Sequence, residues 1–278
     1  MLPAELESLI RRALAEDVGS GDITTLCTVP SSAVGKGRIV ARESLILAGI
    51  AVAKQVFWTA NSLLEVASSL QDGDLAKPGQ SLLEVTGSLA AILMAERTAL
   101  NFLQRLSGIA TLTRTYVDKL SGTRTRILDT RKTTPVWRFL EKEAVRAGGG
   151  YNHRFGLYDG VLIKDNHIIA AGGIQQAVLA ARTCKPHTLM VEVEVETLDQ
   201  LDEALAAGID AVLLDNMNLE TIAEAVKRVD GQVLVEASGG ITLDNIGEVA
   251  ATGVDLISVG ALTHSARAVD ISMEIETA

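Results

Sequence analysis

The sequence predicts an α/β protein whose larger part is a closed or nearly closed βα barrel, preceded by a smaller sheet domain. From about residue 126 onward, short apolar strands alternate with helical stretches, and this rhythm is typical of a parallel sheet covered by helices. An open doubly wound sheet usually carries a Gly-rich loop after its first strand, and no such loop is present. The barrel is therefore the favoured architecture.

Six segments of the barrel region read as strands. They are RILDT (126–130), VLIK (161–164), LMVEVEV (189–195), AVLLD (211–215), VLVEA (233–237) and DLISV (255–259). A weaker seventh candidate lies near 113–120, so the count stays below the eight strands of a complete barrel.

The first third of the chain has a different pattern. Between residues 36 and 86, short apolar runs alternate with turn-rich pieces, which predicts a small sheet with hairpins and one helix near 50–59. Leucines at helical spacing predict a long helix over 89–106, with Ser107-Gly108 as its stop. The tail AVDISMEIE alternates like a strand, and we expect it to return to the amino-terminal sheet.

Composition excludes several classes of function. The formal net charge is −10 and aromatic residues make up 3% of the chain, which disfavours a nucleic-acid partner. No apolar run reaches the roughly 20 residues of a membrane span, and the first residues lack the pattern of a secretory signal. Two cysteines, Cys27 and Cys184, have neither disulfide nor metal-ligand spacing. We therefore expect a cytoplasmic protein without membrane or nucleic-acid partners.

The carboxyl ends of the predicted barrel strands carry polar residues, and functional groups of βα barrels come from these ends. Taken singly, each such residue is more often merely solvated. Together they bring charged groups to one rim, and the last two strands end in glycine-containing turns that are typical of phosphate sites. The residues are Arg131, Lys132, Lys164, Glu194, Asp215, Ser238, Gly239, Gly240 and Gly260.

The run MVEVEVE predicts carboxylates inside the barrel. Strand alternation places its valines on the helix-covered side and Glu192, Glu194 and Glu196 on the other. A carboxylate in a confined interior needs a cation or metal partner, and Lys164 or a divalent ion can serve. We assign Glu192 to a polar lower layer and Glu196 to solvent, and select Glu194 as the functional acid.

Basic residues gather in three segments despite the acidic net charge. Arg suits planar, bidentate recognition of carboxylates and phosphates, whereas Lys acts as a point charge. The pattern predicts a small, multiply anionic, phosphorylated substrate. The residues are Arg97 on the long helix, Arg131, Lys132 and Arg138 in DTRKTTPVWR, and His153 and Arg154 in GGGYNHR.

Several segments, in order, resemble the quinolinate phosphoribosyltransferase family. They are EDVGSGDITT, ERTALNFLQRLSGIAT, DTRKTTP, GGGYNHRFGLYDGVLIKDNH, EVEVE, LLDN, EASGGI and ISVGALTHS. The resemblance covers the chain from about Glu16 onward, and the NHRFGLYDGVLIKDNH block is its most specific part.

The resemblance implies an incomplete, type II phosphoribosyltransferase-like βα barrel with an amino-terminal α/β sandwich. The corresponding domains are 1–107, joined by 268–278, and 108–267. It also implies a magnesium-dependent reaction in NAD biosynthesis, in which quinolinate and phosphoribosyl pyrophosphate give nicotinate mononucleotide, pyrophosphate and carbon dioxide. A homodimer, or a higher assembly of dimers, is the expected state.

The resemblance further implies a role for each selected residue. Arg131, His153, Arg154 and Lys164 resemble the residues around the quinolinate carboxylates, and Lys132 a contact to quinolinate or pyrophosphate. Glu194 and Asp215 resemble the acids near the ribose hydroxyls and magnesium. Arg97 resembles an arginine that reaches the partner subunit's site. Ser238, Gly239, Gly240 and Gly260 resemble the cradle of the 5′-phosphate.

One departure from the family pattern concerns the loop after DTRKTTP. The family has Gly-Leu there, whereas this chain has Val136-Trp137, and a β-branched valine resists a positive φ. We therefore expect the turn to differ, and we leave Arg138 out of the candidate site.

Two alternatives remain beside the main hypothesis. One is the related transferase-like protein of molybdenum-transport operons, and the other is a non-catalytic anion-binding relative. The intact NHR and LIKDNH segments argue against the first, and the retention of Lys132, Lys164 and two acids argues against the second. A type I phosphoribosyltransferase is disfavoured because its acidic pair followed by Gly-Thr is absent.

Overall fold

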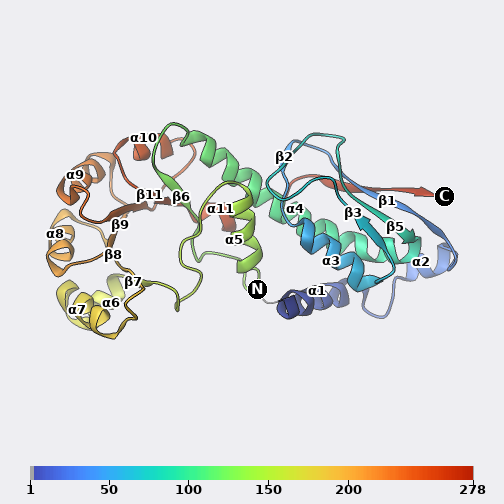
Figure 1. Ribbon diagram of the computed structural model, residues 1–278, viewed down its shortest axis with the longest axis horizontal. Coiled ribbons are helices and arrows are strands. Elements are labelled where there is room, and N and C mark those ends of the chain that lie inside the picture. The colour runs from blue at the N-terminus through green and yellow to red at the C-terminus, as the bar shows by residue number, and fades with distance from the viewer. Residues whose placement is uncertain (1–2, 278) are drawn as a thin grey trace. The chain divides into compact units, whose positions relative to one another are not determined.

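The computed structural model describes residues 3–277, which form two compact units (Figure 1). The first unit holds the residues up to Thr113, 139–149, and those from Ala266 onward. The second holds 114–138 and 150–265. No helix of the described chain is long and apolar enough to cross a membrane.

The first unit is built on an antiparallel sheet in the order β12-β1-β5-β3. β12 lies beside β1 in a register that runs from Ala41–Ile271 to Gly35–Thr277. The expected helix near 50–59 is present as α3. The elements are α1 (Pro3–Val18), α2 (Ile23–Thr28), β1 (Val34–Ala41), β2 (Leu45–Ile46), α3 (Ile50–Ala60), β3 (Glu65–Ala67), β4 (Leu75–Ala76), β5 (Ser81–Ser88), α4 (Leu89–Lys119), α5 (Arg138–Ala147) and β12 (Ile271–Thr277).

The long helix α4 corrects two predictions. It does not stop at Ser107-Gly108, and the weak strand expected near 113–120 is its last part. Gly108 serves a close approach of backbone instead, because a Cβ there would lie 2.0 Å from the carbonyl oxygen of Arg267. A glycine can be required by packing inside a helix as well as at its end.

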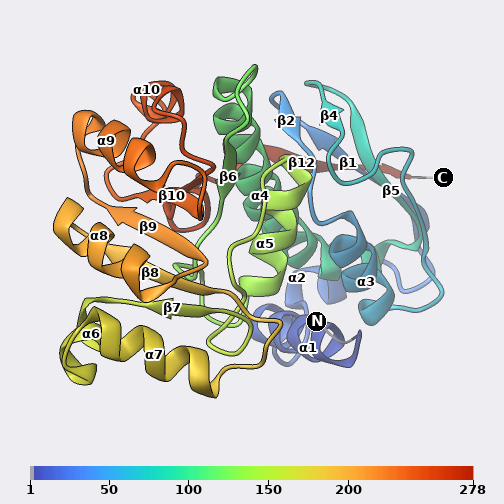
Figure 2. The ribbon, with the colours of Figure 1, turned by 60° about the vertical axis from the view of Figure 1, so that its left-hand side comes forward.

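The second unit contains a six-stranded parallel sheet in the order β6-β11-β10-β9-β8-β7. All six predicted strands are present, and helices run along the outer side of the curved sheet (Figures 1 and 2). The elements are β6 (Arg126–Leu128), β7 (Val161–Ile163), α6 (Asp165–Ala171), α7 (Ile174–Cys184), β8 (Val191–Val195), α8 (Leu198–Ala207), β9 (Ala211–Asp215), α9 (Leu219–Val229), β10 (Leu234–Ser238), α10 (Ile246–Ala251), β11 (Leu256–Ser258) and α11 (Ala261–His264). The predicted incomplete barrel is confirmed.

Local sequence fixes where the barrel helices begin and end. The Thr197 hydroxyl accepts the Gln200 N–H at the start of α8, and Gly208 ends that helix with a φ of 81°. The Asn218 side chain accepts the Thr221 N–H at 2.9 Å at the start of α9. Side-chain oxygens before a helix and a left-handed glycine after it satisfy the terminal backbone groups. These caps set the strand-to-helix loops that carry the candidate site.

β8 shows the alternation expected from MVEVEVE. Val191, Val193 and Val195 are buried, while Glu192 and Glu194 are half-buried. Glu196 is exposed, as expected. The hydrophobic effect thus directs the valines toward the helices and leaves the two glutamates on the inner face.

Candidate active site

A cavity of about 340 Å³ opens at the carboxyl ends of the barrel strands. The cavity is lined by residues of β7, β8, β9, β10 and β11 or of their carboxyl ends, by the loop after β6 and by the segment that holds His153, as expected for a βα barrel. Eight selected residues meet there: Arg131, Lys132, His153, Arg154, Lys164, Glu194, Asp215 and Ser238. Its other lining residues are Thr130, Leu162, Leu213, Glu236 and Ser258.

Lys164 is held at the end of β7 by both its backbone and its side chain. It is the first residue before α6, and its N–H donates to His167 Nδ1 at 3.0 Å. Its ammonium group forms an ion pair with Glu194, which confirms the expected pairing. His167 was not selected from the sequence, although it stands in the LIKDNH segment that carried the resemblance.

The loop after β9 orients the second acid of the rim. Asn216 adopts a φ of 54°, a left-handed conformation that asparagine tolerates better than most residues. Its side-chain amide donates to Asp215 Oδ2 at 2.8 Å. Asn216 therefore orients one carboxylate oxygen of Asp215, and the Asp215 side chain also lines the cavity.

The loop after β6 presents two cations, Arg131 and Lys132, to the cavity. Arg131 and Lys132 are exposed, and neither forms an ion pair within residues 3–277. The Lys132 N–H donates to Thr130 Oγ1 at 3.0 Å, and the Lys132 carbonyl accepts the Thr263 hydroxyl at 2.7 Å. The backbone is thus fixed while both charges remain available to an anion.

Val136 marks the departure from the family pattern in the loop after β6. Val136 adopts a φ of 62°, so a β-branched residue sits where the family pattern has glycine. Such a conformation costs about 1–3 kcal/mol. Val136 thus adopts the positive φ that a β-branched residue resists, and whether the turn differs from that of the family stays a prediction.

Arg138, which the sequence reasoning set aside, ties this loop to the next one. Its guanidinium donates to Thr133 Oγ1 at 2.9 Å and to the carbonyl of Phe155 at 3.1 Å. A third donation, at 3.4 Å, reaches the carbonyl of Arg131. The family motif was the signal for this residue, and the valine substitution obscured it.

The segment that carries His153 runs beside β6. Tyr151 forms a parallel bridge with Leu128, and the His153 N–H donates to Asp129 Oδ1 at 2.9 Å. The Arg154 N–H donates to His153 Nδ1 at 2.6 Å, so this ring nitrogen is an acceptor and Nε2 carries the proton. Burial, followed by the neighbouring Arg131, lowers the pKa of Arg154 from its usual value.

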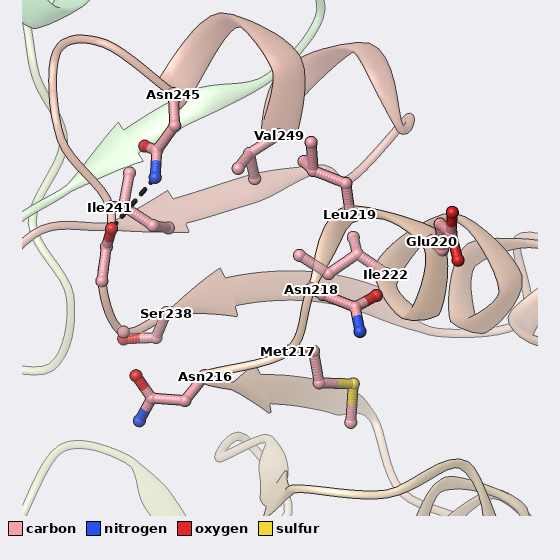
Figure 3. A pocket seen from close by; sticks show the side chains of 12 residues that line it. Asn216, Met217, Asn218, Leu219, Glu220, Ile222, Ser238, Ile241, Asn245 and Val249 are labelled. Atoms are coloured by element: carbon pink, nitrogen blue, oxygen red, sulfur yellow. Dashed lines mark hydrogen bonds between the residues drawn. The ribbon is translucent and has the colours of Figure 1, made fainter.

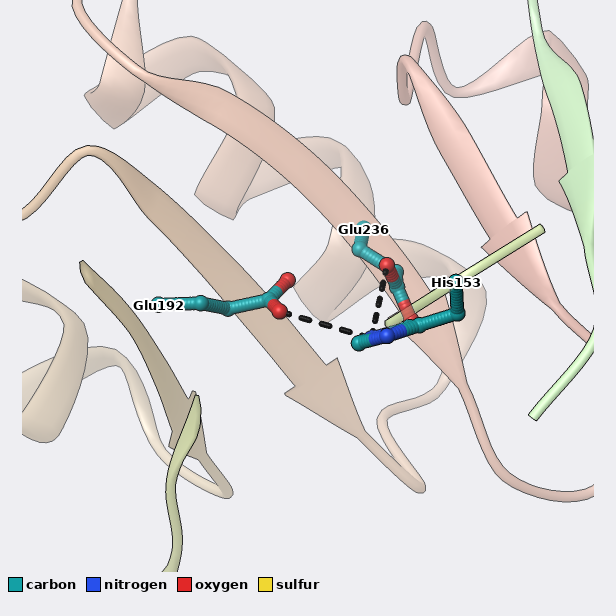
Figure 4. A group of neighbouring side chains, drawn as sticks. All are labelled: His153, Glu192 and Glu236. Carbon is teal, nitrogen blue, oxygen red and sulfur yellow. Dashed lines mark ion pairs between the residues drawn. The ribbon is translucent and has the colours of Figure 1, made fainter. Parts of the chain in front are cut away.

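His153 Nε2 faces two carboxylates on the inner wall of the barrel (Figure 4). It lies 3.4 Å from Glu192 Oε2 and 3.8 Å from Glu236 Oε2. Glu236 is 1% exposed, and burial together with Glu192 raises its pKa to about 7. Glu236 was missed because the sequence reasoning considered only strand ends, whereas it lies two residues before the end of β10.

A larger hollow of about 720 Å³ adjoins the cavity through the shared residue Ser238 (Figure 3). Gly239 and Gly240 line it with φ values of 86° and 63°. A Cβ at Gly239 would lie 2.3 Å from Asn216 Oδ1, so only glycine fits there. The Gly240 carbonyl accepts the Asn245 amide at 3.0 Å.

Two selected residues lie outside both lined spaces. Gly260 begins α11, and a Cβ there would lie 3.1 Å from Lys132 Cδ and from His264 Nε2. Arg97 is an exposed residue of α4 in the first unit. Its predicted role concerns a partner subunit.

The cavity contains a donor set that suits a hard divalent cation. Glu194 and Asp215 both line it, and carboxylate oxygens are the protein ligands that Mg²⁺ prefers. Asp215 uses one oxygen for Asn216, and Glu194 is paired with Lys164. The carboxylates of Glu194 and Asp215 therefore fit a magnesium ion.

The fold and the cavity define an α/β-barrel enzyme that holds a small, multiply anionic substrate at the carboxyl ends of its strands. Comparison with known families sharpens this class. The model of "Quinolinate phosphoribosyl transferase, N-terminal domain" matches residues 22–107, and that of "Quinolinate phosphoribosyl transferase, C-terminal domain" matches residues 109–274. The chain belongs to the quinolinate phosphoribosyl transferase family.

Individual relatives agree over nearly the whole chain. The probable carboxylating nicotinate-nucleotide pyrophosphorylase of Bacillus subtilis is 45% identical, with 98% of this chain and 93% of that protein covered. The carboxylating nicotinate-nucleotide pyrophosphorylase of Mycobacterium leprae is 46% identical, with 96% and 95% covered. The crystal structure of NadC from Streptococcus pyogenes has a TM-score of 0.96 at 42% identity, with 100% and 99% covered.

Proposed function

We propose that this enzyme transfers the phosphoribosyl group of phosphoribosyl pyrophosphate to quinolinate with loss of carbon dioxide, giving nicotinate mononucleotide and pyrophosphate. The observation that carries the proposal is one cavity that is lined both by Arg131 and Lys132, which have no ion-pair partners in the described chain, and by Glu194 and Asp215. We further propose that the reaction serves de novo NAD biosynthesis in the cytoplasm.

The basic residues that line the cavity suit a substrate with two adjacent carboxylates. Arg131 and Arg154 offer planar donor groups that match carboxylate oxygens, and Lys164 adds a point charge. Charge-assisted hydrogen bonds of this kind each contribute about 1.5–3 kcal/mol. Two carboxylates engage more of these donors than one does, so quinolinate is bound in preference to nicotinate.

The acids suit the departure of pyrophosphate from the sugar. That departure leaves an oxocarbenium-like carbon, and fixed carboxylates nearby stabilise the developing positive charge. Glu194 and Asp215 are the acids we assign to this role, beside the ribose hydroxyls. The quinolinate ring nitrogen then attacks the sugar carbon, so no protein nucleophile is required. The cationic ring withdraws the electron pair that the departing carbon dioxide leaves behind.

We propose Glu194 and Asp215 as the residues that hold Mg²⁺ with the substrate. When bound, the ion supplies charge neutralisation for the pyrophosphate oxygens. Lys132 is positioned by Thr130 and Thr263 to contact the same anion or quinolinate. Ser238, Gly239, Gly240 and Gly260 are proposed to hold the 5′-phosphate through backbone N–H groups.

The decisive experiment incubates purified protein with quinolinate, phosphoribosyl pyrophosphate and Mg²⁺ and follows nicotinate mononucleotide. Nicotinate serves as the control substrate. We expect product from quinolinate alone. Binding of quinolinate by folded protein without release of pyrophosphate would contradict the proposal and favour an anion-binding role.

We also propose a homodimer, or an assembly of dimers, in which Arg97 completes the partner subunit's site. Arg97→Ala and Lys164→Ala chains should then each be nearly inactive, while their verified heterodimer recovers part of the activity through one intact site. Because Arg97 is exposed on α4, its removal should leave the unfolding temperature unchanged. Absence of recovery in verified heterodimers would contradict a shared site.

A further inference from the structure

Glu236 is the deepest charged residue of the cavity wall. Its neighbours in the sheet register are Leu213 on β9 and Leu256 on β11. The side chain is 2% exposed, yet it lines the cavity together with Leu162 and Leu213. An ionised carboxylate in such surroundings is costly unless it is paired.

The contacts of Glu236 leave one of its oxygens unused. Oε2 lies 3.8 Å from His153 Nε2, and the carboxyl group forms a hydrogen bond with Ser258. Oε1 is buried and has no hydrogen-bond partner within the described chain. Buried polar atoms are almost always partnered, so Oε1 remains able to carry a proton or to accept a hydrogen bond from a group that enters the cavity.

The groups around Glu236 come from four different parts of the barrel. Glu192 of β8 and burial raise the pKa of Glu236 to about 7, while His153, Ser258 of β11 and Lys164 act in the opposite direction. The carboxyl group can therefore hold a proton near neutral pH, where an ordinary glutamate is ionised. An acid of this kind is suited to proton transfer.

The second half of the proposed reaction requires a proton. When the 2-carboxylate leaves the pyridinium ring as carbon dioxide, the electron pair of the broken bond stays on C2. Until C2 receives a proton, the carbanion can recapture the carbon dioxide. A proton donor beside the ring therefore makes the loss irreversible.

We propose that Glu236 is the catalytic acid that protonates C2 of the ring after carbon dioxide departs. This inference rests on the function proposed above. The C2–carboxylate bond breaks, the Glu236 O–H bond breaks, and a C2–H bond forms. The carboxylate left on Glu236 then regains a proton from water.

Other donors of the cavity are less suited to this step. The Lys164 ammonium is paired with Glu194, and Lys132 is exposed at the rim. His153 accepts the Arg154 N–H at Nδ1 and directs Nε2 toward two carboxylates. Glu236 alone combines a raised pKa with a buried oxygen that has no partner within residues 3–277.

The test variant is Glu236→Gln, which keeps the shape and loses the acidity. In single turnovers, pyrophosphate, carbon dioxide and nicotinate mononucleotide are measured separately. We expect quinolinate binding and pyrophosphate release to stay within about threefold of the unchanged protein. Nicotinate mononucleotide should form about 100-fold more slowly, the lower end for loss of a general acid, while the dicarboxylated mononucleotide accumulates.

Two further variants serve as a rescue and as a control. Glu236→Asp retains an acid and should restore part of the slow step. Glu196→Gln, which removes an exposed carboxylate that follows β8, is the control and should leave pyrophosphate release and nicotinate mononucleotide formation unchanged. Circular dichroism establishes that each variant is folded.

The outcomes separate this inference from the proposed function. If the unchanged protein forms no nicotinate mononucleotide, the proposed function fails. If the unchanged protein is active and Glu236→Gln slows both steps equally, or neither, the role of Glu236 as acid is overturned. The decarboxylation phase of the unchanged protein should also slow as the pH rises through about 7, and this dependence should be absent in Glu236→Gln.

Discussion

The exposed face of the amino-terminal sheet and the inner face of the barrel use the same charged residues in opposite ways. On the sheet, Arg38 and Arg42 both contact Glu274, at 2.7 and 2.8 Å. Lys36 pairs with Glu84 at 2.6 Å, with both side chains about 40% exposed. In the barrel, Lys164 pairs with a Glu194 that is only 15% exposed, and Glu236 has an unpartnered oxygen in the described chain.

The difference separates structural charges from functional ones. Exposed pairs contribute about 0–1 kcal/mol each, so the sheet can change them at little cost. Buried and incompletely paired charges cost stability, and a protein retains them where a ligand completes them. A cavity beside such charges marks the active site, since Arg38 Nε on the sheet is also buried without a hydrogen-bond partner in the described chain.

The sharpest test exchanges one lysine in each region. Lys164→Met should lower kcat/KM by about 1,000-fold, because it leaves Glu194 uncompensated and removes a cation from the substrate cavity. Lys36→Met is the matched control, since its lysine has nearly the same exposure, 40% against 42%. It should change kcat/KM less than twofold. Equal losses in steady-state assays would break the distinction.

The next test concerns a rim cation without a carboxylate partner in residues 3–277. Arg131→Ala should raise the KM for quinolinate by about 10–100-fold, since one charge-assisted contact is lost. Arg131→Lys should recover only part of this loss, because lysine lacks the planar pair of donors. An unchanged KM in titrations against quinolinate would remove Arg131 from the binding site.

A third test measures the energetic cost of the buried acid. Burial and Glu192 raise the pKa of folded Glu236 to about 7 from an ordinary 4.5, so the folded protein holds this proton more tightly than the unfolded chain. The resulting stability is complete below about pH 4.5 and is lost as the pH rises toward 7. Glu236→Gln lacks this dependence.

From pH 5 to pH 8, the unchanged protein should therefore lose about 2 kcal/mol of unfolding free energy relative to Glu236→Gln. Urea unfolding at several pH values measures the difference. Glu274→Gln on the sheet is the control, because Arg38 and Arg42 lower the pKa of Glu274. Parallel stability curves for the unchanged protein and Glu236→Gln would contradict the assignment of a raised pKa.

The smallest expected effect concerns the strained loop. Val136→Gly should stabilise the protein by about 1 kcal/mol, because relief of the strain at the positive φ outweighs the greater conformational entropy that glycine has in the unfolded chain. The unfolding temperature should rise by about 2–4 °C. Val161, with an ordinary backbone, provides the control, since Val161→Gly should destabilise. A fall in the unfolding temperature of Val136→Gly would show that the valine side chain stabilises the loop.

Periodic features of the sequence predicted the barrel well. Alternating valines and glutamates defined β8 and its inner face, and apolar runs located the other strands, because burial imposes those patterns directly. Gly108 gave a misleading signal, since its need for a close neighbour depends on Arg267, which is distant in sequence. Local patterns carry no information about such contacts.

The sequence predicted the site residues that lie at the ends of barrel strands, but it did not predict the site residue that lies within a strand. Lys164 and Glu194 follow from strand ends and alternation. The place of Glu236 in the site can be seen only once β10 is paired with β9 and β11, where Leu213 and Leu256 are its register neighbours. The φ of Val136 contradicts its local preference, and only the folded loop determines it.

The strand order has a consequence for how the chain folds during synthesis. β7 to β10 can pair with successive neighbours as they emerge, but β6 pairs with β11, where Thr125 and Val254 are 129 positions apart. In the other unit β1 pairs with β12, and the contact of Arg38 with Glu274 spans 236 positions. Non-local pairings of this kind slow folding. A ribosome-bound chain that lacks the segments after Asp255 therefore exposes an unpaired edge of β1 and of β6. We expect chaperones to bind these exposed edges during synthesis.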